Sequence, residues 1–189
     1  MITKALERVA LTALLDTAFS ALHPAMDHWA QRGEDARLKG LAGRQLVHAD
    51  GTPATGEDGR PTMTASACGR RAAARHVAGY TLGQVVGTLA VTRALGYRVP
   101  PGALLAGAAI NAVTHFVIDR RTPLLYLAKA ARKDGYVAHC GVVRRDPETG
   151  EFKSDTFGPG TAAMELDQSA HRFIGLGAAV VTAALAVRR

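Results

Sequence analysis

Four stretches of this chain are dominated by apolar and small side chains, and each is long enough to form a helix. They span about residues 9–26, 77–92, 99–118 and 173–187. Each lies near the lower limit of roughly 20 apolar residues that a helix needs to cross a bilayer. Ala and Gly outnumber Leu and Ile in them, which lets membrane helices pack closely. Residues 1–189 are therefore expected to form one mainly all-α membrane-embedded domain, a transmembrane four-helix up-down bundle; a water-soluble Ala-rich bundle is the alternative.

The connections between these helices differ greatly in length. Residues 32–75 are expected to be a loop or insertion, rich in Gly and Pro, with at most a weak hairpin. Residues 120–160 begin with an amphipathic helix at 122–133. A small β-hairpin is expected to follow before the last helix, because the β-prone segments 136–143 and 151–157 flank the turn sequence Asp-Pro-Glu-Thr-Gly.

Histidine and aspartate occur together three times at a spacing of four residues, which places both side chains on one face of a helix. Each pair adjoins an apolar stretch, where an ionisable group is costly without a partner. In an up-down bundle, the ends of odd helices and the starts of even helices lie at the same face. We therefore expect convergence of His76, at the start of the second helix, with the pairs His23/Asp27, His115/Asp119 and Asp167/His171.

Imidazole nitrogens and carboxylate oxygens are good ligands for a divalent transition metal. The predicted cofactor is zinc in the first place, with manganese or iron as alternatives. The predicted metal ligands are the paired residues, His23, Asp27, His115, Asp119, Asp167 and His171. A set of buried His–Asp hydrogen bonds joining the helices would account for the same pairs. Pro24 removes a helical hydrogen bond and could kink the helix just before Asp27.

Asp27, His76 and Asp119 are the candidates for catalysis. An aspartate that does not ligate the metal, or His76, could act as a general base. His76 has no acidic residue four positions away, so the roles of ligand, proton carrier and polar helix start all stay open. Arg120 and Arg121 follow the third helix directly, where they could bind an anionic group or anchor the helix end at the membrane surface.

The distribution of basic residues predicts an orientation in the membrane. The chain has a net charge of +7, yet only six of its 23 Lys and Arg residues lie at the termini and in the short second connection. The positive-inside rule places the long loops in the cytoplasm, as in a multi-pass protein of the bacterial inner membrane. Cys68 and Cys140 are then expected to be reduced thiols in these loops. The basic segments lack interleaved aromatic residues, so nucleic acid is not an expected partner.

Four motifs resemble, in order, those of a known family. They are His-Pro-Ala-Met-Asp-His-Trp-Ala-Gln, His-Val-Ala-Gly-Tyr-Thr-Leu-Gly-Gln, Thr-His-Phe-Val-Ile-Asp-Arg-Arg-Thr-Pro and Leu-Asp-Gln-Ser-Ala-His-Arg-Phe. Together they resemble a family of bacterial and phage membrane proteins known only as a domain of unknown function (number 3307). They resemble more distantly the inner-membrane proteins described as metal-dependent hydrolases. The resemblance covers about residues 18–186, except 51–71, and implies a membrane location. It matches His23, Asp27, Gln31, His76, His115, Asp119, Asp167, Gln168 and His171.

Two functions are consistent with the sequence. The first is a membrane protein with a His/Asp metal centre on the cytoplasmic side, acting as a metal-dependent hydrolase of a small molecule. The second is a non-enzymatic bacterial or phage membrane protein, with a role in ion binding, transport or interaction, whose His/Asp pairs are structural. The sequence contains no Gly-rich phosphate-binding loop, no dinucleotide-binding fingerprint and no serine nucleophile elbow.

Overall fold

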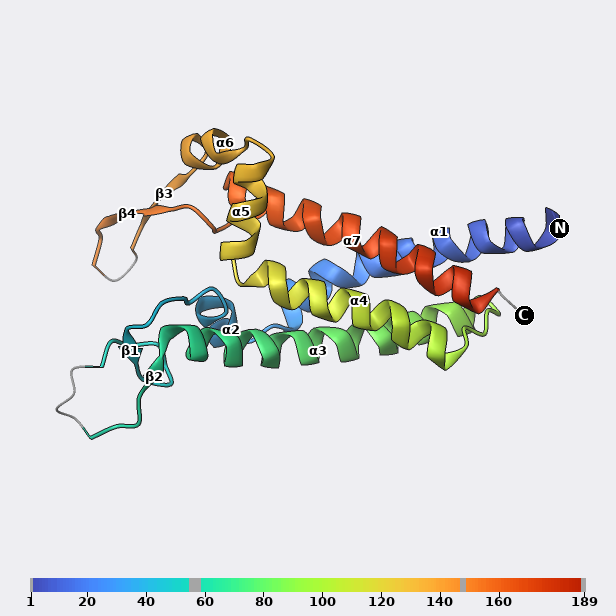
Figure 1. Cartoon of the computed structure of the whole chain (residues 1–189), viewed down its shortest axis with the longest axis horizontal. Helices are drawn as coiled ribbons and strands as arrows, with labels where there is room; N and C mark the ends of the chain where they lie inside the picture. Colours follow the sequence, from blue (N-terminus) through green and yellow to red (C-terminus); the bar gives the residue numbers. More distant parts are fainter. Residues whose placement is uncertain (1, 55–58, 147–148, 188–189) are drawn as a thin grey trace.

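The computed structural model describes residues 2–54, 59–146 and 149–187, and most of these residues are helical (Figure 1). The prediction of a mainly helical protein is therefore confirmed. The helices in the described part of the chain are α1 (Ile2–Pro24), the π-helical segment η1 (Ala25–Ala30), α2 (Gly33–Leu38), α3 (Ala65–Ala94), α4 (Pro101–Asp119), α5 (Thr122–Ala130), α6 (Asp134–His139) and α7 (Ala162–Ala186). Two short antiparallel pairs accompany them, β1 (Leu46–Val47) with β2 (Met63–Thr64) and β3 (Val142–Arg145) with β4 (Phe152–Asp155).

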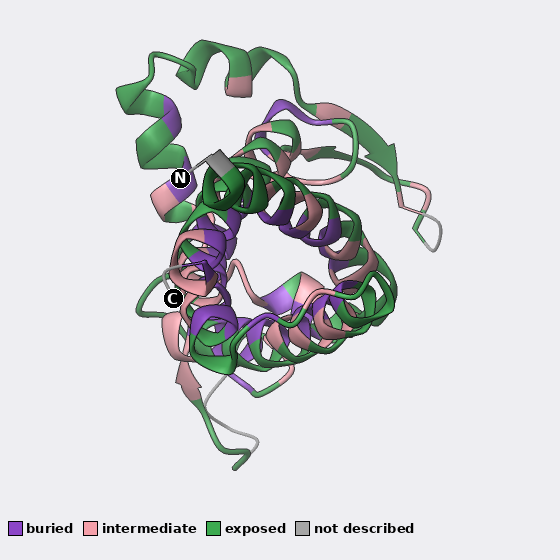
Figure 2. Ribbon diagram, turned by 90° about the vertical axis from the view of Figure 1, so that its right-hand side faces the viewer, coloured by how far each residue is buried: buried purple, intermediate pink, exposed green. Residues whose placement is uncertain are grey.

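The four long helices pack side by side and alternate in direction along the chain (Figure 1). Helix α1 contacts α3 and α7, and α4 contacts the same two helices, so the four enclose a common interior. Figure 2 looks along the helices and shows that the buried residues lie on their inward faces. Leu11, Leu15 and Phe19 of α1 share one buried cluster with Ala178 and Ala183 of α7. The alanines of α7 allow this close approach of the helices.

Helices α3 and α7 begin about three turns before the apolar stretches that predicted them. A threonine caps each start: Thr64 Oγ1 accepts a hydrogen bond from Ala67 N, and Thr161 Oγ1 accepts one from Met164 N, both at 3.2 Å. Such a cap satisfies one of the free N–H groups in the first helical turn. The added turns carry charged side chains, which is why the apolar pattern did not reveal them.

The α-helical geometry of α1 ends at Pro24, but the chain stays helical and continues directly as the π-helical segment η1. Proline has no N–H to donate to the preceding turn, and the wider turn of a π-helix follows it here. Asp27 of η1 is buried, and its Oδ2 atom lies 3.5 Å from His23 Nε2. The predicted disturbance at Pro24 therefore leaves the first His–Asp pair on one face of the helix.

The long connection at residues 32–75 is folded against the beginning of α3. Leu38 of α2 and Val47 of β1 share a buried cluster with Ala65 and Cys68 of α3. The expectation that Cys68 lies in a loop is wrong, because the early start of α3 includes it and buries it. The exposed Cys140 follows α6, and both cysteines are free thiols.

The segment before α7 contains the predicted amphipathic helix, as α5, and the predicted β-hairpin, as β3 and β4. The hairpin is confirmed, but the first strand was placed too early. Helix α6 occupies part of residues 136–143, with a helical hydrogen bond from Cys140 N to Tyr136 O, and β3 begins only at Val142. Four of the residues used in the sequence arguments lie outside the described part of the chain, namely Pro147, Glu148, Arg188 and Arg189.

Three helical stretches are long and apolar enough to cross a membrane. They are Thr3–Ala30, Pro101–Asp119 and Ala162–Ala186. Helix α3 is not among them, because polar residues lower its hydropathy. Several of its polar residues, among them His76, Gln84 and Thr88, are nevertheless buried, whereas the large apolar side chains of Leu82 and Val86 are 66% and 57% exposed.

Candidate metal centre

Four ionisable side chains from three separate segments meet in the interior of the helices. Asp27 comes from η1, His76 from α3, and His115 and Asp119 from α4. The Nε2 atoms of His76 and His115 lie 2.9 Å apart. Asp27 Oδ1 lies 2.9 Å from His76 Nε2 and 3.4 Å from His115 Nε2. Asp119 Oδ2 lies 3.3 Å and 3.2 Å from the same two nitrogens.

The spacing of three of these donor atoms, Asp27 Oδ1, His76 Nε2 and His115 Nε2, fits neighbouring ligands of a metal ion. Zinc bonds of about 2.0–2.2 Å place neighbouring donors of a tetrahedron roughly 3.3 Å apart. Asp27 Oδ1 and Asp119 Oδ2 are buried and lack a hydrogen bond within the described chain, although Lys39 Nζ forms an ion pair with Asp119 Oδ2 at 3.0 Å. Buried carboxylate oxygens are costly without a donor or a cation, so an ion among the four atoms would stabilise both. Asp27, His76 and His115 could therefore hold a metal ion.

His23 and His171 lie directly beside the four donors. The ring centroids of His171 and His115 are 4.2 Å apart, and those of His23 and His171 are 4.8 Å apart. His115, Asp119 and His171 form a second group whose donor atoms all lie within 4.8 Å of one another. All the predicted histidine ligands thus lie in one buried region at the same end of the helices.

Asp167 stands apart from both groups of donor atoms that the described residues form. Its Oδ2 atom accepts a hydrogen bond from Gln168 Nε2 at 3.3 Å, and its backbone carbonyl accepts one from His171 Nδ1 at 2.9 Å. Its side chain lines a cavity rather than the buried donor cluster. Asp167 therefore orients the ring of His171 while its carboxylate stays accessible.

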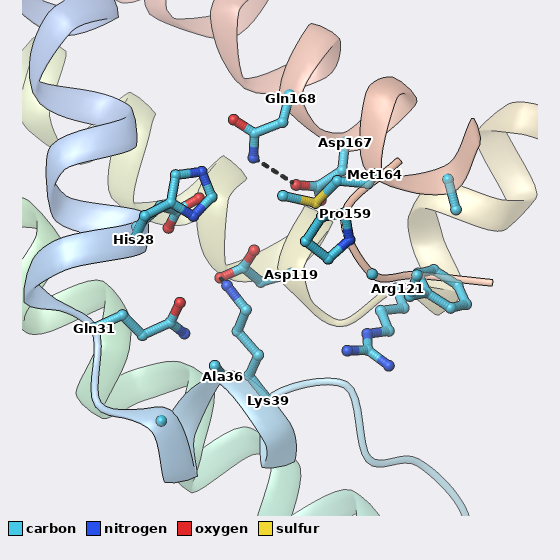
Figure 3. Close-up of a pocket in the computed structure, with 15 residues that line it drawn as sticks. His28, Gln31, Ala36, Lys39, Asp119, Arg121, Pro159, Met164, Asp167 and Gln168 are labelled. Atoms are coloured by element: carbon cyan, nitrogen blue, oxygen red, sulfur yellow. Dashed lines mark hydrogen bonds and ion pairs between the residues drawn. The ribbon is translucent and has the colours of Figure 1, made fainter. Parts of the chain in front are cut away.

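A cavity of about 390 Å³ borders the buried donors (Figure 3). Asp27 and Asp119 contribute to its lining, and Asp167 contributes from α7. Figure 3 shows Lys39 extending from α2 toward Asp119, and Arg121 also lines the cavity. Carboxylates that could bind a metal thus share this cavity with two cations that attract an anionic group.

Gln31 and Arg120 hold the segment that carries Lys39. The side-chain amide of Gln31 can be oriented so that both its nitrogen and its oxygen have hydrogen-bond partners. In this orientation the nitrogen donates to the backbone oxygen of Asp27 at 2.9 Å, and the oxygen accepts from Lys39 Nζ at 3.3 Å. The Arg120 guanidinium donates to the backbone carbonyls of Lys39 and Leu41. Arg120 is therefore engaged with the backbone, and Arg121 is the arginine that lines the cavity.

One wall of the cavity is held by Asp155, at the end of β4. Its Oδ1 atom accepts hydrogen bonds from the backbone N–H groups of Phe157 and Gly158 at 2.9 and 2.8 Å, and its Oδ2 atom accepts one from Arg144 Nε at 2.6 Å. Burial by itself would raise the pKa of Asp155, but these hydrogen bonds outweigh it and hold the pKa below its usual value. The Arg121 guanidinium lies 4.7 Å above the Phe157 ring, which links this wall to the cavity.

A chain of buried polar residues lies behind His23. Asn111 Nδ2 donates to Gln84 Oε1, and Gln84 Nε2 donates to the Tyr80 hydroxyl oxygen, both at 2.9 Å. That oxygen lies 3.2 Å from His23 Nδ1. Sequence reasoning did not assign a role to Tyr80, Gln84 or Asn111. The available signal was the spacing of four residues from His76 to Tyr80 and from Tyr80 to Gln84, on one face of α3.

Purely structural His–Asp hydrogen bonds explain this region less well than metal ligation. His23 Nε2, His115 Nδ1 and His171 Nε2 are buried and have no hydrogen-bond partner within the described residues. Free imidazole nitrogens and carboxylate oxygens in one buried region can together coordinate a divalent cation. Comparisons of the chain with protein-family models, curated proteins and solved structures find no match.

Proposed function

We propose that the protein is an integral membrane hydrolase that depends on a divalent metal, zinc in the first place. One observation carries the proposal: Asp27 Oδ1 and Asp119 Oδ2 each lie 2.9–3.4 Å from the Nε2 atoms of His76 and His115, buried beside a cavity. Two neutral imidazoles and two carboxylates balance the charge of one divalent ion. When bound, such an ion polarises the bond to be cleaved and activates a water molecule.

Asp167 is the general base in this proposal, because Asp27, His76 and Asp119 are used as ligands. Its carboxylate faces the cavity, where a substrate and a water molecule can reach it. Lys39 and Arg121 line the same cavity and attract a substrate that carries negative charge. The substrate class that fits best is a small phosphate ester or a negatively charged carboxylic ester.

The proposed location is a bacterial inner membrane, in which α1, α3, α4 and α7 form a transmembrane up-down bundle. Exposed apolar side chains on these helices support it, since lipid tails would cover them. They include Val9, Leu82, Val86, Leu105, Val113, Phe173 and Val180. The excess of basic residues in the long connections supports a cytoplasmic position for the cavity. The resemblance to the membrane family named above agrees with this location.

The proposal is tested on the full chain purified in detergent. We expect about one zinc ion per chain or more, and zinc-dependent release of p-nitrophenol from p-nitrophenyl phosphate. His76→Gln and His115→Gln should lose both metal and activity, whereas His139→Gln, at an exposed position on α6, should keep both. Metal far below one ion per chain, unchanged by the two site variants, overturns the proposal. So does recovery of the protein in the soluble fraction without detergent.

A second candidate function is cation transport, and one observation favours it. Helix α3 carries a buried polar residue at every fourth position from the metal centre toward the other end of the helices, namely His76, Tyr80, Gln84, Thr88 and Thr92. Polar residues in a membrane interior often line ion pathways. Zinc flux into vesicles that contain the wild-type protein, lost in Gln84→Leu and not accompanied by zinc-dependent hydrolysis, would support transport over catalysis.

A further inference from the structure

We propose that the protein holds a second divalent ion between His23 and His171, and that Asp27 bridges the two ions. This inference deepens the proposed function and rests on it, because the first ion is the one held by Asp27, His76, His115 and Asp119. The argument depends on the hydrogen bonds of the two histidine rings and on the position of the Asp27 carboxylate.

The ring of His171 presents a free nitrogen to the buried region. Its Nδ1 atom lies 2.9 Å from the carbonyl oxygen of Asp167, and a carbonyl can only accept, so Nδ1 carries the proton. In the neutral ring, Nε2 is then an unprotonated acceptor. This Nε2 is buried and has no hydrogen-bond partner among the described residues. A nitrogen of this kind, with the other ring nitrogen bonded to a carbonyl, is typical of a metal-ligating histidine.

His23 is held in the same way. Its Nδ1 atom lies 3.2 Å from the Tyr80 hydroxyl oxygen, which can accept a hydrogen bond from it, and its Nε2 atom is buried without a hydrogen bond in the described chain. The rings of His23 and His171 are stacked, with an interplanar angle of 26° and centroids 4.8 Å apart. Two free imidazole nitrogens on neighbouring rings provide two ligands for one ion.

Asp27 lies between the two pairs of histidines. Its Oδ1 atom faces His76 and His115, at 2.9 and 3.4 Å from their Nε2 atoms. Its Oδ2 atom lies 3.5 Å from His23 Nε2. Each oxygen of one carboxylate is thus directed to a different set of imidazoles, which is the arrangement of a bridging ligand. In two-metal sites the ions lie about 3.5–4 Å apart, a separation that one carboxylate can span.

A second ion also accounts for the concentration of buried carboxylates. Asp27 and Asp119 are buried, and Asp167 lies next to His171. The three negative charges of these carboxylates exceed the charge of one divalent ion. Two divalent ions would neutralise them and leave one net positive charge. That excess, together with Lys39 and Arg121 in the cavity, favours a dianionic substrate. A two-ion clamp suits displacement at phosphorus, so a phosphate monoester is the substrate class we infer.

Metal titration of the full-length protein in detergent tests this inference. Wild-type protein stripped with a chelator should bind two zinc ions per chain. His23→Gln and His171→Gln should each bind one, and His28→Gln, an exposed histidine at the cavity, should still bind two. Manganese-loaded wild-type protein should show the exchange-coupled electron paramagnetic resonance signal of a bridged pair, and Asp27→Asn should lose it.

The outcomes separate this inference from the proposed function. One ion in the wild type, retained in His23→Gln and His171→Gln but lost in His76→Gln, overturns the second ion and leaves the hydrolase proposal intact. No bound ion in the wild type overturns both. Because the wild-type titration and the manganese spectrum need no variant at His23 or His171, a folding defect in those variants does not prevent a decision.

Discussion

Lys39 Nζ lies 3.0 Å from Asp119 Oδ2, so a lysine from the connection after α1 is paired with a carboxylate of the candidate metal centre. The lysine side chain is only 15% exposed, which reduces screening by solvent. A metal ion bound by Asp119 would lie close to this ammonium group and be repelled by it. The same ammonium group would attract an anionic substrate.

Lys39→Met should therefore have opposite effects on metal and on anions. Removing the like charge should tighten zinc binding by about tenfold or more, and inhibition by inorganic phosphate should weaken. Zinc affinity is measured by competition with a chromophoric chelator, and phosphate inhibition is measured in the hydrolysis assay. Lys129→Met, at an exposed position of α5, is the matched control and should change neither. Weaker zinc binding in Lys39→Met would show that the lysine supports the metal site.

The contact between α4 and α7 depends on Gly107. A Cβ atom at this position would lie 2.0 Å from Thr182 Oγ1 and 3.2 Å from the carbonyl oxygen of Ala178. Thr182 is fixed by its own hydrogen bond to that carbonyl, at 2.8 Å, so neither atom can move easily. We expect Gly107→Ala to lower the free energy of unfolding by about 1–3 kcal/mol, measured by denaturation in detergent.

Gly102 provides the matched control on the same helix. A Cβ atom there would meet nothing within 4 Å, and alanine has a higher helix propensity than glycine. Gly102→Ala should therefore leave the protein equally stable or stabilise it slightly. Equal effects of the two substitutions would contradict a tight α4–α7 contact at Gly107.

Asp155 should make the cavity wall sensitive to acid. Its pKa is lowered in the folded protein, so its stabilising contribution is complete above its unfolded pKa of about 3.9 and is lost as the pH falls through the lower folded value. The amide resonance of Gly158 should therefore titrate in this acidic range in nuclear magnetic resonance spectra. Asp155→Asn should remove that step, and Glu151→Gln, at an exposed position in the hairpin, should leave it unchanged. A Gly158 titration that persists in Asp155→Asn would assign it to another group.

Val113 tests the proposed contact of α4 with lipid. Its side chain is 65% exposed on α4, which has no charged residue before Asp119 at its end. Val113→Lys should oppose membrane insertion by about 2.5–3.5 kcal/mol, the cost of a lysine at the centre of a membrane helix. The measurement is the membrane-inserted fraction in a cell-free translation with microsomes or vesicles. Tyr126→Lys, 71% exposed on α5, should insert normally; equal insertion of both variants would argue against a lipid-facing α4.

The apolar pattern predicted the bounds of a long helix well where that helix is apolar from end to end. Residues 99–118 correspond to α4, Pro101–Asp119, because this helix is apolar along almost its whole length. The starts of α3 and α7 were missed, since their first turns are polar and depend on the caps at Thr64 and Thr161. Helices α2 and α6 were missed as well, because each has only six residues and is too short to show a period.

The candidate site was predictable where its residues are ionisable and spaced by one helical turn. The pairs at His23 and His115 stood out for that reason, and His76 stood out at the start of an apolar stretch. Lys39 did not, because its position beside Asp119 depends on how the connection after η1 folds back. The supporting role of Tyr80 could not be read from the sequence, since a tyrosine in an apolar helix more often packs than bonds to histidine.

The π-helical turn after Pro24 lets the candidate metal centre tolerate a change of one residue in helix length. A π-helical segment accommodates one residue more than the α-helix it interrupts, and Asp27 lies within it. A chain shortened by one residue between Pro24 and Asp27 could restore a regular α-helix in which Asp27 lies three positions after His23, so the two side chains would stay on one face. Such a deletion would keep a continuous helix of nearly the same length and phase, so the wider turn lets this helix gain or lose one residue while the Asp27 carboxylate still faces the imidazoles of α3 and α4.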